Sequence, residues 1–69
     1  MILNEKDFSS LVKSASAKGW KTSTEDYGDG CISYGFSKTH GVYTNYMFAI
    51  SQKKGEYEIF DYYYDELNK

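Results

Sequence analysis

The spacing of the apolar residues changes once along the chain, close to Gly19. Before it, apolar side chains recur at intervals that place them on one face of a helix: Phe8, Leu11, Val12 and Ala15. Asn4 is a favourable N-cap residue, and Gly19 stands where helices commonly end in a left-handed residue. The pattern therefore predicts an amphipathic helix over residues 4–18.

After Gly19 the apolar and polar residues alternate, which is typical of strands with one buried face. The longest such run is residues 42–52, which begins V-Y-T-N-Y-M-F-A-I-S and holds no Gly or Pro. Two more strands are predicted over residues 31–38 and 56–64, with residues 20–24 as a short fourth strand. We predict an α+β fold, in which an N-terminal helix packs on one face of a three- to four-stranded antiparallel β-meander (α-β-β-β-β).

Two loops of three residues, 39–41 and 53–55, each end in Gly and predict type I turns with a G1 bulge. These loops give three cross-strand rows: Ile32–Phe48–Phe60, Tyr34–Tyr46–Tyr62 and Phe36–Thr44–Tyr64. All three rows lie on one face, so we expect this face to form the core beneath the helix. Phe48 is then central to the core, and Met47 lies on the opposite face, which no predicted element covers.

The composition fits one small domain, residues 1–69, with an aromatic core. Eight Tyr, four Phe and one Trp provide most of the large apolar side chains. The single Cys31 excludes an internal disulfide, which favours a reducing, cytoplasmic setting. No apolar run approaches the ~18 residues of a membrane span. Charged residues follow Met1-Ile2-Leu3 at once, so we expect no signal peptide.

The uncovered face of the predicted sheet is the main indication of function. Together with the C-terminal segment it presents Tyr and Met beside acidic residues, and these are the candidate binding residues: Tyr43, Met47, Tyr57, Ile59, Asp61, Tyr63, Asp65 and Glu66. Tyr and Met are enriched at protein interfaces. We therefore predict a protein-binding module. The alternatives are a face that is merely solvated and a face through which two copies form a homodimer.

The charge distribution narrows the kind of partner. The net charge is −2, and residues 55–69 hold one Lys against five acids. An acidic, aromatic surface suits a basic, nucleic-acid-binding surface of another protein. The chain has no Arg, and its abundant Lys, Ser and Tyr suggest AT-rich coding, as in many phages and mobile elements. The narrower hypothesis is therefore an anti-defence inhibitor, encoded by a phage or mobile element, that docks onto a host protein that handles nucleic acid or acts in defence.

Direct binding of single-stranded nucleic acid is the rival hypothesis, because an aromatic sheet face can stack bases. The charge argues against it. Phosphate binding needs Lys or Arg near the stacking surface, whereas the strand richest in Tyr is the acidic one.

No set of residues predicts catalysis, a metal site or a cofactor. The predicted strand places Cys31 and His40 at opposite ends of a hairpin, roughly 20 Å apart, too far for a nucleophile and its base. The acidic loop at residues 25–30 resembles a calcium loop only faintly, because Gly28 and Gly30 occupy positions that need ligands.

Overall fold

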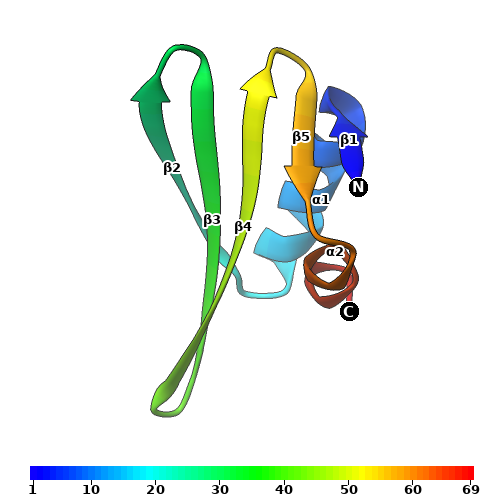
Figure 1. Cartoon of the computed structure of the whole chain (residues 1–69). Coiled ribbons are helices and arrows are strands. Elements are labelled where there is room, and N and C mark those ends of the chain that lie inside the picture. Colours follow the sequence, from blue (N-terminus) through cyan, green and yellow to red (C-terminus); the bar gives the residue numbers. More distant parts are fainter.

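The computed structural model describes all 69 residues as one antiparallel sheet and two helices. In chain order the elements are β1 (Ile2–Asn4), α1 (Glu5–Ala17), β2 (Lys21–Gly28), β3 (Cys31–His40), β4 (Tyr43–Lys53), β5 (Glu56–Ile59) and α2 (Asp61–Leu67). The predicted α+β class, with an N-terminal helix on an antiparallel sheet, is confirmed (Figure 1). Residues 21–24 do join the sheet as the first part of β2, which continues to Gly28 where a loop over residues 25–30 was predicted.

The ends of α1 follow the local signals in the sequence. The Asp7 amide donates a hydrogen bond of 2.7 Å to the Asn4 side-chain oxygen, so Asn4 is the N-cap. At the other end Gly19 has a φ of +95°, and the Trp20 amide donates to the Ala15 carbonyl at 3.0 Å. This pair of features is the Schellman ending, which turns Trp20 back into the core.

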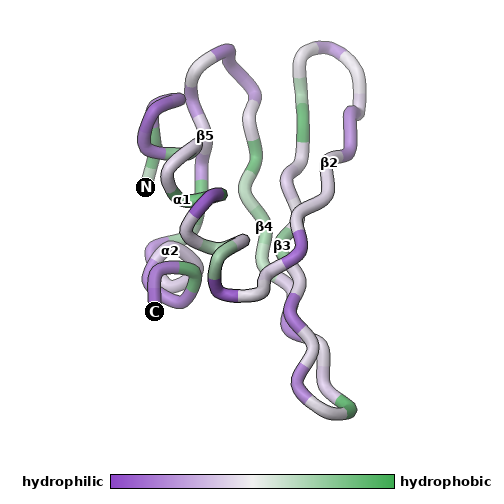
Figure 2. The backbone as a smooth tube through the Cα atoms, turned by 180° about the vertical axis from the view of Figure 1, so that it is seen from behind, coloured by the Kyte–Doolittle hydropathy of each residue, from purple (hydrophilic) through white to green (hydrophobic).

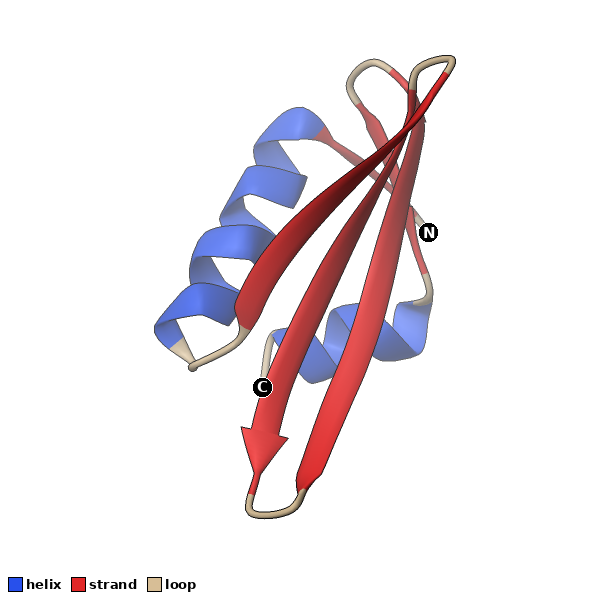
Figure 3. Cartoon of the chain, turned by 90° about the vertical axis from the view of Figure 1, so that its left-hand side faces the viewer, coloured by secondary structure: helices blue, strands red, loops and turns tan.

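The sheet order is β1-β5-β4-β3-β2, so the first two strands along the chain lie at opposite edges. Helix α1 connects them and lies along one face of the sheet (Figures 1 and 3). The sequence prediction lacked β1, which pairs with β5 through Leu3 opposite Tyr57. Three residues are too few to show a period, and Leu3 is buried in the core.

The predicted register of the first hairpin is wrong. Strands β3 and β4 close on His40 and Tyr43, around a two-residue turn at Gly41 and Val42, instead of a three-residue loop. Gly41 has a φ of +60°, as Gly-X hairpin turns require at their first position. The pairing moves by three residues, an odd number, so every side chain of β4 changes face.

The second hairpin keeps the predicted pairing offset at Ala49 and Ile50 but departs from it near the turn. There Lys53, in place of Gln52, lies opposite Glu56, and the register shifts between Ile50 and Lys53. Strand β5 also ends early. Ala49 lies opposite Ile59, as the predicted register requires, yet β5 stops there and Phe60 begins a helix. The predicted strand over residues 56–64 is therefore wrong beyond Ile59. Its end is helix α2, which lies just past the end of β5 (Figure 1) and buries Leu67 completely.

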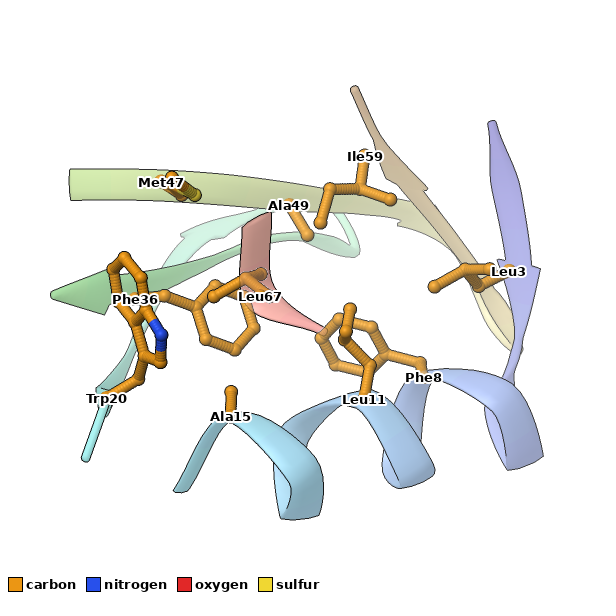
Figure 4. Close-up of a cluster of buried hydrophobic side chains, with 10 residues drawn as sticks. All are labelled: Leu3, Phe8, Leu11, Ala15, Trp20, Phe36, Met47, Ala49, Ile59 and Leu67. Carbon is orange, nitrogen blue, oxygen red and sulfur yellow. The ribbon is translucent and has the colours of Figure 1, made fainter. Parts of the chain in front are cut away.

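The core lies between α1 and the sheet, and Figure 4 shows the side chains of both layers pointing toward one another. Phe36 of β3 is 1% exposed and is among the largest fully buried side chains. Strand β4 contributes only Met47 and Ala49, which are small or flexible. The core residues are Leu3, Phe8, Leu11, Ala15, Trp20, Phe36, Met47, Ala49, Ile59 and Leu67.

Candidate protein-binding surface

The sheet face away from α1, here called the outer face, carries large apolar side chains without a covering element. It is the face turned to the viewer in Figure 1, where α1 lies behind the sheet. Phe48 is 49% exposed and Ile50 is 44% exposed, and Tyr46 and Ile2 are more exposed still. Ile50 and Ile2 both lie opposite Glu58, so they share this face across three strands.

An open pocket of about 450 Å³ lies on this part of the molecule, and we call it the outer pocket. All but one of its lining residues are apolar: Met1, Ile2, Phe48, Ile50, Glu58, Ile59, Phe60 and Tyr63. A smaller hollow of about 190 Å³ adjoins it through Ile2, Ile50 and Glu58 and adds Gln52, Lys53 and Glu56. The surface thus changes from apolar to polar along β4 and β5.

Two local features shape the outer face. Gly35 of β3 lies opposite Phe48, and the Phe48 ring stands at an ordinary contact distance of 3.6 Å from where a Gly35 Cβ would lie. The Ser23 hydroxyl of β2 would be only 2.9 Å from that Cβ, so the absence of a side chain at Gly35 makes room for Ser23. At the other end of the pocket the Phe60 and Tyr63 rings meet edge to face, with centroids 5.3 Å apart. Because Phe60 is the N-cap of α2, the helix start fixes this wall.

Around the outer pocket and the adjoining hollow, three acids (Glu56, Glu58 and Asp61) face two cations, Lys53 and the Met1 amino group. Glu58 is the one charged side chain that lines the outer pocket. Next to it, the amino group of Met1 forms an ion pair of 3.3 Å with Asp61 and donates a hydrogen bond of 2.8 Å to the Ile59 carbonyl. Asp61 is exposed, so this pair is solvent-screened and holds the first strand in place only weakly.

Three predicted binding residues lie on the wrong face. Met47 is 7% exposed and Ile59 is buried, and both belong to the core. Tyr57 stacks on Phe8 of α1, with ring centroids 4.1 Å apart and an interplanar angle of 3°. Burial raises the pKa of the Tyr57 hydroxyl, and nearby Tyr34 and Glu5 raise it further. The cause of the error is the β3–β4 register, which exchanged the two faces of β4. The faces of β5 were predicted from its pairing with β4, so they were exchanged as well.

The remaining predicted residues are exposed or partly exposed but do not form one surface. The β3–β4 hairpin extends beyond the helices (Figure 2), and Tyr43 lies on it beside the fully exposed Val42. Asp61, Tyr63, Asp65 and Glu66 lie on α2. Of the predicted set, only Ile59 and Tyr63 line the outer pocket. Sequence reasoning missed Phe48 and Ile50, which a two-residue turn at Gly41 would have placed outside. It also missed Ile2 and Phe60, which lie in β1 and at the start of α2, two elements that were not predicted.

The two side chains considered for catalysis lie at opposite ends of β3, Cys31 at its start and His40 at its end. No three His, Cys, Asp or Glu side chains gather where they could hold a metal ion. Neither helix has the length and apolar character needed to span a bilayer.

Comparisons of the chain with protein-family models, with curated proteins and with solved structures give no match. The outer face and its chemistry are therefore the basis for assigning a function to this chain.

Proposed function

We propose that this protein is a small, non-enzymatic binding module that docks another protein on its outer pocket. The observation that carries the proposal is the exposure of Phe48, Ile50 and Ile2 together on a sheet face that no helix covers. Contiguous exposed apolar patches with a polar rim typically mark interaction sites. Aromatic residues are enriched at the centres of such interfaces.

The rim defines the chemistry of the partner. Glu58 lies in the outer pocket, Glu56 lies in the adjoining hollow, and Asp61 stands at the start of α2. A complementary segment would insert apolar side chains into the pocket and place Lys or Arg against these carboxylates. If that basic segment normally contacts nucleic acid, docking would block it, and the protein would act as an inhibitor. A cytoplasmic setting belongs to the same proposal and is supported by the unpaired Cys31.

A selection from a displayed library of random peptides tests the proposal without a known partner. We expect the selected peptides to combine large apolar residues with Lys or Arg. Phe48→Ala should weaken their binding about tenfold or more, as truncation of a central aromatic anchor does. Glu58→Lys should weaken the basic peptides while leaving the domain folded, because Glu58 is exposed.

Val42→Ala is the matched control, because Val42 is 92% exposed at the hairpin tip and far along β4 from the pocket. It should bind the selected peptides like the wild type. Equal binding by wild type and Phe48→Ala would contradict the proposal. So would tight, salt-sensitive binding of single-stranded oligonucleotides that Phe48→Ala abolishes, since that result assigns the face to nucleic acid.

A further inference from the structure

Strand β2 is a long free edge of the sheet. It is the last strand in the order β1-β5-β4-β3-β2, and nothing lies beyond it in Figure 1. All eight of its residues are exposed. The opposite edge, β1, has only three residues. The outward-pointing N–H and C=O groups of a free edge can pair with another strand.

The devices that protect an edge lie toward the two ends of β2, with Lys21 at its start and charged residues and a bulge toward its end. The chain has no Pro, and the irregularity of the β2–β3 pairing is confined to Asp26 and Gly28. Residues 21–25 pair regularly with β3, from Lys21 opposite Ser37 to Glu25 opposite Ser33. Lys21 is the single basic residue of this segment, and it forms no ion pair within the chain.

The sequence of β2 is complementary to itself when it runs antiparallel. A regular ladder between two copies needs the two-fold axis to pass through a residue, because opposite residues must share a face. With the axis at Ser23, Lys21 lies opposite Glu25 on both sides, and Thr22 lies opposite Thr24. With the axis at Thr22 or Thr24, Lys21 meets Ser23 or Tyr27 instead. Within residues 21–25, the register about Ser23 therefore pairs both charged residues with their opposites, while Asp26 lies beyond this segment.

We propose that β2 pairs with β2 of a second copy of this chain, antiparallel about a two-fold axis at Ser23. The two sheets then form one continuous sheet with Lys21–Glu25 pairs flanking the axis. One Glu25 oxygen already accepts a hydrogen bond of 2.6 Å from the Tyr27 hydroxyl, and the other is free to meet the partner's lysine. The Thr22–Thr24 pairs add β-branched contacts on the other face.

This dimer leaves the outer pocket open, since β2 and the pocket lie at opposite ends of the strand order. The two-fold axis is perpendicular to the sheet, so both outer faces point the same way and the two pockets lie on the same side of the continuous sheet, toward its two far edges. A partner with two docking segments would then bind both copies at once. Because the ladder covers only residues 21–25, we expect association that depends on concentration.

Sedimentation velocity over a wide concentration range tests the proposal. The wild type should move from a mass of 8.0 kDa toward twice that value. Lys21→Glu and Glu25→Lys each replace two attractive cross-strand pairs by two repulsive ones and should each weaken the dimer about tenfold. The double variant Lys21→Glu/Glu25→Lys restores opposite charges in the same register and should dimerise like the wild type.

Lys54→Glu, in the turn between β4 and β5, makes the same charge change away from the edge and should leave the dimer intact. A wild type that stays at 8.0 kDa even at millimolar concentration would overturn the proposal. A dimer that resists both single charge reversals and is lost with Phe48→Ala would also overturn it, because the contact would then be the outer face.

Discussion

The two faces of β4 carry opposite combinations of size and burial. The inner face presents Met47 and Ala49, which are buried, whereas the outer face presents Tyr46, Phe48 and Ile50, which are exposed. The reason is the layer that each face meets. The inner face meets the core, where Met47 and Ala49 pack with the fully buried Phe36 and Leu67. The large apolar side chains lie on the outer face, which no other element of the chain covers.

Hydrophobicity alone therefore does not identify which face of so small a sheet forms the core. Both faces of β4 are apolar, so alternation could not decide which face points inward. The exposed set has the composition of an interface, and the buried set has the dimensions of a packing layer. Substitutions on the two faces of β4 and in the core test that division.

Phe36→Ala should cause the largest loss. Phe36 is 1% exposed and fills the centre of the core, so its truncation should cost about 3–5 kcal/mol of unfolding free energy. Phe60→Ala removes the same ring from an exposed position and should cost less than about 1 kcal/mol. Urea unfolding measures the free energy that each variant loses. Equal losses would contradict the burial of Phe36 and the exposure of Phe60.

Ala49→Leu should destabilise the fold by about 1–3 kcal/mol, because extra methyl groups must be accommodated between β4 and the helices. Asn45→Leu is the matched control, since Asn45 lies on the same face of β4 but is exposed. Thermal unfolding should show a lower midpoint for Ala49→Leu only. A midpoint that rises in Ala49→Leu would mean that the inner face has unfilled space.

Tyr57→Phe should have the smallest effect, visible only at alkaline pH. Burial first, and then Tyr34 and Glu5, raise the pKa of Tyr57 above 10.0 in the folded chain. The hydroxyl therefore contributes stability that is fully present below pH 10.0 and is lost as the pH rises through the folded-state pKa. Unfolding measured from neutral to alkaline pH should show a shallower decline in Tyr57→Phe. Tyr46→Phe, on the exposed face, should follow the wild type, and identical declines in all three proteins would contradict the burial of Tyr57.

The parts of the fold that depend on neighbouring residues could be predicted from the sequence. The helix ends follow from Asn4 and Gly19, whose effects act within a few residues. The register of β4 could not be predicted, because K-T-H-G-V-Y can close as a two-residue or a three-residue loop. The two choices differ by an odd shift, and that shift exchanged Met47 with Phe48 between the core and the candidate site.

The C-terminal helix shows a second limit of local reasoning. The segment D-Y-Y-Y-D-E-L is rich in Tyr, which favours strands, yet it forms α2. Its helical state is stabilised by distant contacts, chiefly the complete burial of Leu67 in the core and the hydrogen bond from the Lys18 side chain to the Asn68 carbonyl. Neither contact is visible from residues nearby in the chain. Because α2 was not predicted, the part of the outer pocket that Phe60 and Tyr63 line was not predicted either.

Urea unfolding of Met47→Ala and Phe48→Ala, measured side by side, tests whether Met47 points into the core and Phe48 points out of it. The two residues are adjacent on one strand and differ in the face to which they point. We expect Met47→Ala to lose about 2 kcal/mol or more and Phe48→Ala to lose about 1 kcal/mol or less. The reverse order, with Phe48→Ala the more destabilised, would return Phe48 to the core and remove the outer pocket as a candidate binding surface.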